Sequence, residues 1–292
     1  MTQPPGVKNV ALVVHHKRPQ AHTLAAEVAT WLHERGHTAR LPPDDADVVA
    51  LPALAWPEAQ LAGGLDLAIS LGGDGTMLRT VDLVAAADVP VLGVNVGQMG
   101  YLTEVEPADV TPALERFVAG EYGIEERMLL SVAAVIDGRA SAVGPVTALN
   151  EAVLEKTPMG HTVRLSVSLD GDFFTTYAAD GLIVATPTGS TAYSFSARGP
   201  IVAPEHRALL LTPVSPHMLF DRTLVLEPET EVRLEVCGHR PATLNVDGRN
   251  LGILEEGDLV ICTASDRSAR LVTFEPRDFH RILKAKFDLF DR

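Results

Sequence analysis

The chain has 292 residues, of which 46% are hydrophobic and 21% charged, and it carries a formal net charge of −14 at pH 7. This length exceeds the size at which one hydrophobic core usually stops growing, so we expect two domains. The acidic charge argues against a nucleic-acid-binding surface, which needs basic stripes. No stretch of about 18 uncharged apolar residues occurs, so we expect no membrane span.

The chain also lacks several features that would point to secretion or metal binding. Its N-terminal residues have no basic region, apolar core or cleavage site of a secretory signal, which predicts a cytoplasmic protein. Only Cys237 and Cys262 are present, so no disulfide framework is expected, and their spacing matches no zinc site.

The first part of the chain alternates short apolar runs with a stretch of helical spacing. The runs are residues 10–16, 65–71 and 89–95, while residues 21–36 carry apolar side chains at the period of a helix. Apolar runs without alternation are typical of parallel strands covered on both faces. The sequence therefore predicts an α/β domain with a parallel sheet over residues 1–125.

After about residue 126 the pattern changes to alternating strands and tight turns. Residues 163–169 alternate apolar and polar side chains before an Asp-Gly pair, and residues 242–249 repeat this pattern. We expect a β-rich, antiparallel, sandwich-like domain over residues 126–274. Helical spacing returns in residues 275–292, which are predicted to rejoin the first domain.

A glycine-rich turn, Gly72-Gly73-Asp74-Gly75-Thr76, follows one of the predicted parallel strands and opens a predicted helix. Ligands of α/β sheets gather at such turns, and glycines let a phosphate or a ribose approach the backbone amides. No P-loop pattern occurs, and Leu78 stands where a dinucleotide fingerprint needs glycine. Asp74 caps the helix, holds a metal or accepts a proton from a hydroxyl nucleophile, and phosphoryl transfer requires the last of these roles.

The basic residues near this turn are few. None of the five lysines lies near it in the sequence, so a phosphate bound there must rely on backbone amides, on arginine or on a bound metal. Arg79, one turn after Asp74, is either a surface residue of the helix or a contact for an anion. His15-His16 is interpreted as the end of a strand.

A second polar cluster spans residues 180–196, where an apolar run leads into a loop rich in serine and threonine. Its hydroxyls and free amides can form a hydrogen-bonding pocket, and Tyr193 can pack against a base or a ribose. The alternative is an ordinary polar loop. The pair Asn150-Glu151 is either solvated or able to recognise a ribose or a base edge, and Asp247-Gly248 is interpreted first as a hairpin turn.

Taken together, these residues resemble the NAD kinase family over most of the chain. The glycine-rich turn is shared with diacylglycerol-kinase-like lipid kinases and loosely with phosphofructokinases, whereas TPTGSTAY, residues 186–193, is much more specific. The pattern Asn95-x-Gly97-x-x-Gly100 and the pairs Asn150-Glu151, Asp180-Gly181 and Asp247-Gly248 follow in the order of the family.

The resemblance implies transfer of a phosphoryl group from ATP, with inorganic polyphosphate as an alternative donor, to the adenosine ribose 2′-hydroxyl of NAD, which gives NADP. It implies that Asp74 is the proton acceptor, that Mg²⁺ accompanies the donor, and that the enzyme is a homodimer or homotetramer. No protein metal site is predicted. The implied substrate-binding residues are Asp74, Gly75, Arg79, Asn150, Glu151, His161, Asp180, Thr191, Ala192, Tyr193, Ser194, Phe195 and Ser196.

Two positions depart from the family pattern. Ala178 stands where a basic residue is frequent, and Arg198 replaces a usual glycine. His161 and Arg164 are candidates to replace the missing charge. Two alternative functions are a diacylglycerol-type lipid kinase and a non-catalytic sensor of NAD or NADPH.

Overall fold

The structure is a computed structural model that describes residues 8–97, 100–140, 145–157, 161–276 and 278–289. Contacts divide the chain into two compact units, Met1–Glu126 with Ala269–Arg292, and Arg127–Ser268. The chain passes from one unit to the other within two long strands, β5 (Gly123–Ile136) and β17 (Leu259–Thr273). The domain limits drawn from the sequence, 1–125 with 275–292 and 126–274, stay predictions.

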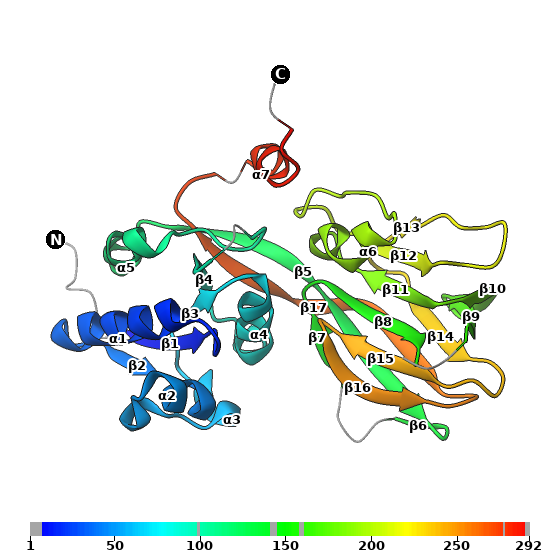
Figure 1. The fold of residues 1–292 in the computed structure, drawn as a ribbon, viewed down its shortest axis with the longest axis horizontal. Helices are drawn as coiled ribbons and strands as arrows, with labels where there is room; N and C mark the ends of the chain where they lie inside the picture. The colour runs from blue at the N-terminus through cyan, green and yellow to red at the C-terminus, as the bar shows by residue number, and fades with distance from the viewer. Residues whose placement is uncertain (1–7, 98–99, 141–144, 158–160, 277, 290–292) are drawn as a thin grey trace. The chain divides into compact units, whose positions relative to one another are not determined.

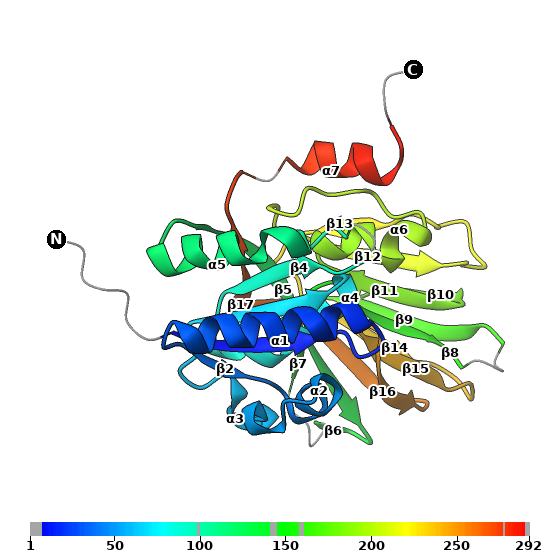
Figure 2. The same ribbon diagram turned by 60° about the vertical axis from the view of Figure 1, so that its left-hand side comes forward.

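The first unit contains a parallel sheet in the order β4-β3-β1-β2, and Leu271 of β17 pairs with Val91 of β4. Strand β3 is buried over its whole length, as expected for an apolar run covered on both faces. Figure 2 shows helix α1 running along β1. The elements of this unit are β1 (Asn9–Val14), α1 (Pro19–Glu34), β2 (Thr38–Arg40), α2 (Pro43–Val49), α3 (Glu58–Leu61), β3 (Leu67–Gly72), α4 (Asp74–Val84), β4 (Val91–Asn95), α5 (Val110–Ala119) and α7 (Phe279–Lys286).

The parallel strands of this unit end at one edge of the sheet. Val14, the last residue of β1, pairs with Leu71 of β3, and Gly72, the last residue of β3, pairs with Asn95, the last residue of β4. The loops after β1, β3 and β4 therefore begin side by side. The chain leaves β1 toward β2 on one side, whereas β3 lies on its other side. This reversal is the type of position at which open α/β sheets bind ligands.

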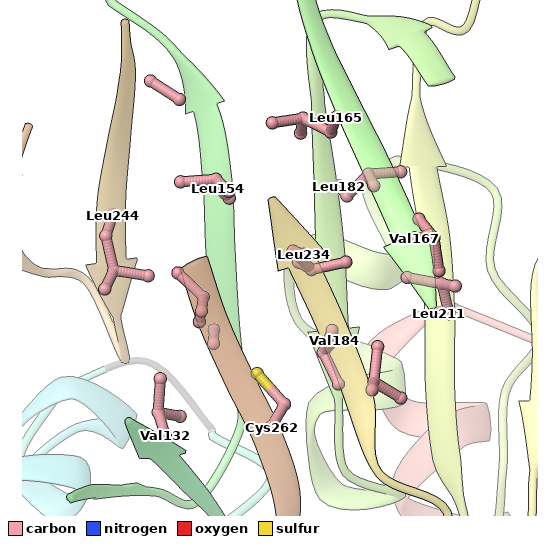
Figure 3. Close-up of a cluster of buried hydrophobic side chains, with 14 of the residues drawn as sticks. Val132, Leu154, Leu165, Val167, Leu182, Val184, Leu211, Leu234, Leu244 and Cys262 are labelled. Carbon is pink, nitrogen blue, oxygen red and sulfur yellow. The ribbon is translucent and has the colours of Figure 1, made fainter. Parts of the chain in front are cut away.

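The second unit consists of two antiparallel sheets, in the orders β10-β9-β14-β17 and β13-β12-β11-β8-β15-β16. Figure 3 shows their apolar side chains pointing toward one another, among them Leu165, Leu182 and Leu234. Apart from β5 and β17, its strands are β6 (Arg139–Ala140), β7 (Val146–Ala148), β8 (Glu151–Lys156), β9 (Val163–Leu169), β10 (Asp172–Ala179), β11 (Gly181–Ala185), β12 (Leu209–Val214), β13 (Leu224–Leu226), β14 (Val232–Val236), β15 (Ala242–Val246) and β16 (Arg249–Leu254). The short helix α6 (Tyr193–Ser196) follows β11 (Figure 1).

The predicted fold class is therefore confirmed: an α/β unit with a parallel sheet, and an antiparallel β-rich unit. The predicted hairpin at Asp247-Gly248 is confirmed as well, since both residues have positive φ, 46° and 77°, and join β15 to β16. In the described ranges, no helix is long and apolar enough to cross a membrane.

Candidate active site residues

Asp74 is the first residue of α4, and its carboxylate holds a neighbouring loop. Its Oδ2 accepts a hydrogen bond from the Tyr101 backbone N–H at 3.0 Å, and its Oδ1 accepts one from Leu102 at 3.1 Å. Gly73, not Asp74, occupies the N-cap position, where no side-chain cap is formed. The helix-capping interpretation of Asp74 therefore does not fit, and the half-buried carboxylate keeps lone pairs beyond these two bonds.

Close approach explains several glycines around this carboxylate. A Cβ at Gly100 would overlap the carboxylate of Asp74, and a Cβ at Gly72 would overlap the side chain of Thr76. At Gly73 and Gly75 a Cβ would meet no protein atom within 4 Å. Neighbouring protein atoms thus account for two of these glycines, whereas the other two leave the backbone amides at the start of α4 accessible to a ligand.

Arg18 approaches the same sheet edge from the loop after β1. Its guanidinium donates to the carbonyl oxygen of Val96 and would overlap a Cβ at Gly97, whose φ is 135°. Such a backbone conformation favours glycine. In the Asn95-x-Gly97-x-x-Gly100 pattern, each glycine is therefore explained by a side chain that approaches its backbone closely, Arg18 at Gly97 and Asp74 at Gly100. Residues 98 and 99 lie outside the described ranges.

Arg79 belongs to a charge network around the buried carboxylate of Asp45. Asp45 is fully buried and pairs with the Arg79 guanidinium, accepts from the Val14 N–H at 2.6 Å, and contacts the His16 imidazole at 2.7 Å. Removing one partner of a buried ion pair is strongly destabilising. A substrate contact by Arg79 stays a prediction, and loss of activity on mutation would not by itself demonstrate one.

In the second unit, the Asp247 carboxylate holds the backbone that carries Asn150 and Glu151. It accepts hydrogen bonds from three successive N–H groups, those of Leu149 at 2.7 Å, Asn150 at 2.9 Å and Glu151 at 3.0 Å. The hairpin turn of Asp247 thus has a second role that its sequence pattern does not indicate.

Glu151 is only 8% exposed, and its Oε2 has no hydrogen-bond partner in the described part of the chain. Burial, followed by the negative charge of Asp247, raises its pKa to about 8, while the backbone N–H of Tyr193 opposes this shift. At neutral pH the carboxyl group is therefore largely protonated and can donate a hydrogen bond to a ligand.

The loop that contains TPTGS packs against Asn150. The Thr186 N–H donates to the Asn150 carbonyl oxygen at 2.8 Å, and a Cβ at Gly189 would overlap that same carbonyl group. The Thr186 hydroxyl donates to the Leu149 carbonyl oxygen at 2.5 Å. Part of the predicted hydroxyl pocket therefore has a structural role, because these groups fix the path of the loop.

Tyr193 lies among acidic side chains and is 36% exposed. Burial raises the pKa of Tyr193 most. The charge of Glu155 and the hydrogen bond between Glu155 and the phenol raise this pKa further, and so do the charges of Asp180 and Glu151. Asp180 forms an ion pair with Lys156 at 2.9 Å. The structure thus brings Tyr193, Glu151 and Asp180 near one another, and their contacts with a substrate stay predictions.

The other residues of 191–196 have different environments. Ser194 is fully buried and hydrogen-bonded to the Thr212 hydroxyl at 2.9 Å, and a Cβ at Gly199 would overlap its Oγ, so its contacts are with the protein. Thr191 and Ala192 are half-buried, and the Thr191 hydroxyl donates to the Thr188 carbonyl oxygen at 3.2 Å. Phe195 and Ser196 are exposed.

A pocket of about 630 Å³ opens beside this loop, lined among others by Tyr193, Ser196 and Arg198. Arg198 has a φ of 68°, so this chain tolerates arginine where the backbone conformation favours glycine.

Of the two candidates to replace the basic charge missing at Ala178, Arg164 is the better placed. It lies directly across from Ala178 in the β9–β10 pair, on the same face, and is exposed. His161 is also exposed, but it precedes β9 and is in register with no residue. Its predicted substrate contact stays a prediction.

No group of three or more His, Cys, Asp or Glu side chains in the described residues is placed to hold a metal ion. Three contacts could not be recognised from the sequence pattern, because in each the two residues are distant along the chain. They join Arg18 to Val96, Tyr101 to Asp74, and Asp45 to Arg79. The glycines at 97 and 100 were the available signal for the first two.

A carboxylate held at the edge of a parallel sheet, beside helix amides that a ligand can reach, is typical of an enzyme that transfers phosphoryl groups. Family models for the ATP-NAD kinase N-terminal and C-terminal domains match residues 56–122 and 149–274.

Full-length relatives agree with these models. The NAD kinase of Heliobacterium modesticaldum is 43% identical over 280 residues, which cover 95% of this chain and 97% of the relative, and that of Symbiobacterium thermophilum is 41% identical over 94% and 97%. The solved yeast NADH kinase in complex with NADH matches with a TM-score of 0.91 and 25% identity, over 98% of this chain and 89% of the other. The chain belongs to the NAD kinase family and is a phosphotransferase. Neither alternative function is favoured.

Proposed function

We propose that the chain transfers the terminal phosphoryl group of ATP to the 2′-hydroxyl of the adenosine ribose of NAD. The observation that carries this proposal is the Asp74 carboxylate, held by two backbone N–H groups beside glycines that leave the start of α4 accessible. The family models, which describe ATP-NAD kinase domains, support donor and acceptor alike. The yeast relative, solved with NADH, supports a nicotinamide dinucleotide as acceptor.

In the reaction, Asp74 accepts the proton of the 2′-hydroxyl. As the O–H bond breaks, the hydroxyl oxygen forms a bond to the γ-phosphorus, the bond from that phosphorus to the ADP oxygen breaks, and ADP leaves with the electron pair. Little covalent chemistry is asked of the protein in such a loose transition state, so positioning and one base can suffice. The amides at the start of α4 favour the negative charge of a phosphate.

Residues of the second unit bind the dinucleotide. The protonated Glu151 carboxyl donates a hydrogen bond through its otherwise unpartnered side, Asn150 offers an amide, and the ring of Tyr193 stacks on a planar group.

The donor is bound as its Mg²⁺ complex. Mg²⁺ usually keeps several waters and is bound through one or two carboxylates together with substrate phosphates. When bound, the ion would neutralise phosphate charge, and Asp74, the carboxylate of the glycine-rich turn, would be the residue available to hold it. A homodimer or homotetramer and a cytoplasmic location stay predictions.

The test is to incubate the purified protein with NAD, Mg²⁺ and either ATP or polyphosphate, and to measure NADP. An NAD analogue without the 2′-hydroxyl should bind without being phosphorylated.

Asp74→Asn should lower turnover by about 10² to 10⁴ with little change in NAD affinity. Asp82→Asn, at an exposed position of the same helix, is the matched control. Absence of NADP with every donor would refute the proposal, and near-normal turnover in Asp74→Asn would refute the assigned base.

A further inference from the structure

Lysine is scarce in this acidic chain, and two of its five lysines, Lys284 and Lys286, lie on the C-terminal helix α7. Although they are far from the glycine-rich turn in sequence, α7 belongs to the same compact unit as that turn. The fold therefore brings a lysine into the same unit as a turn that has no lysine near it in the sequence.

The Lys286 ammonium lies over the ring of Tyr101, with its Nζ 5.0 Å from the ring centroid. This distance is within the range of a cation–π interaction. The backbone N–H of Tyr101 is one of the two groups that hold the Asp74 carboxylate, and the next N–H, that of Leu102, is the other. One side chain of α7 thus contacts the residue whose backbone positions Asp74.

The attachment of α7 elsewhere is modest. None of its residues is fully buried, and its apolar side chains Phe279, Ile282 and Leu283 are only partly covered. Because little apolar area of α7 is buried, contacts at its surface, such as that of the exposed Lys286 with Tyr101, contribute to its attachment.

We propose that Lys286 is a positioning residue: it restrains Tyr101 and thereby keeps the N–H groups of Tyr101 and Leu102 aimed at the Asp74 carboxylate. The inference rests on the proposed function, in which Asp74 accepts the proton. Without the restraint, the loop is free to move away from Asp74, and the carboxylate spends less time in the orientation that accepts the proton.

Activity measurements on matched variants test this role. Lys286→Gln removes the cation at similar length, Lys286→Arg retains it, and Lys284→Gln removes one charge from the same helix while keeping the ammonium over Tyr101. We expect Lys286→Gln to lower kcat about 2- to 5-fold with an unchanged KM for NAD, and the other two to behave as wild type. Equal kcat values for Lys286→Gln and Lys284→Gln, or an effect on KM alone, would overturn the proposal.

A double-mutant cycle tests the route through the ring. Tyr101→Leu removes the aromatic face, so Lys286→Gln should cause no further loss of kcat in that background, whereas it should keep its effect beside Tyr101→Phe. Additive losses with Tyr101→Leu would contradict the role of the ring.

A measurement independent of turnover separates this inference from the proposed function. Hydrogen exchange at the Leu102 amide should be about 2- to 5-fold faster in Lys286→Gln than in Lys284→Gln, because the restraint on its loop is lost. Equal exchange rates would overturn the inference. If the wild-type protein phosphorylates no NAD, the proposed function fails, while the exchange experiment still decides whether Lys286 restrains the loop.

Discussion

Replacing Glu151 by glutamine should change how the stability of the protein depends on pH. Glutamine has nearly the same size as glutamate and resembles its protonated form, but it cannot ionise. The wild-type carboxyl is 8% exposed, and burial together with the charge of Asp247 raises its pKa from 4.5 to about 8. Ionisation of Glu151 is therefore more costly in the folded chain than in the unfolded chain.

The sign follows from the two pKa values. Below pH 4.5 the carboxyl is protonated in both states, and its contribution to stability is fully present. As the pH rises toward 8, the unfolded chain loses its proton while the folded chain keeps it, so the free energy of unfolding falls. At 1.36 kcal/mol per pKa unit the total has an upper limit of about 5 kcal/mol, and relaxation around a buried charge lowers it, so we expect about 2 to 5 kcal/mol.

The assay is denaturant unfolding of wild type and Glu151→Gln across this pH range. The variant should be close to wild type at about pH 5 and more stable by about 2 to 5 kcal/mol at about pH 9. Glu205→Gln, at an exposed position, controls for the loss of one negative charge from an acidic protein. A difference between Glu151→Gln and wild type that stays constant over the range would show that Glu151 does not hold its proton, and the reasoning would be refuted.

Three further substitutions give measurable outcomes. Asp74→Asn should lower the free energy of unfolding by about 1 to 3 kcal/mol, since it replaces one of the two oxygens that accept from the N–H groups of residues 101–102 with an NH2 donor; unchanged thermal stability would mean that these bonds contribute little. Arg198→Gly should leave stability unchanged or raise it by about 1 kcal/mol because φ is positive there, and a lower melting temperature would disprove the assumed strain. Arg164→Ala should raise the KM for NAD severalfold if Arg164 replaces the charge absent at Ala178, and an unchanged KM would exclude that role.

The parts of the fold that the sequence predicts are those with local causes. The apolar run of β3 and the Asp-Gly turn between β15 and β16 are each specified by neighbouring residues, so their patterns can be recognised without knowledge of the rest of the chain. The alternation in β9, where buried side chains alternate with exposed or half-buried ones over residues 163–168, likewise has a local cause. The expected strand at residues 65–71 corresponds to β3, Leu67–Gly72, and the expected strand at residues 163–169 corresponds to β9, Val163–Leu169.

The contacts that hold the predicted site residues could not be predicted because they join distant segments. Asp247 binds the N–H of Leu149 across 98 positions, and Arg79 meets Asp45 across 34. Such pairs depend on strand order and loop path, which no local pattern encodes. A glycine such as Gly100 indicates that something comes close, but the pattern does not show that the neighbour is the carboxylate of Asp74.

Two aspartates in this chain use the same backbone chemistry and differ in what remains for a ligand. Asp247 accepts from three successive N–H groups, and this set of bonds suits a carboxylate whose task is to fix the segment that carries Asn150 and Glu151. Asp74 accepts from two N–H groups, one on each oxygen, is half-buried, and adjoins Gly75, beside which no protein atom would obstruct a ligand. A carboxylate that is oriented by the backbone yet keeps lone pairs beyond its two hydrogen bonds is suited to accept a proton from a hydroxyl group. The number of backbone donors and the adjoining glycine at which a Cβ would meet no protein atom, rather than the aspartate itself, therefore favour Asp74 over Asp247 as the base.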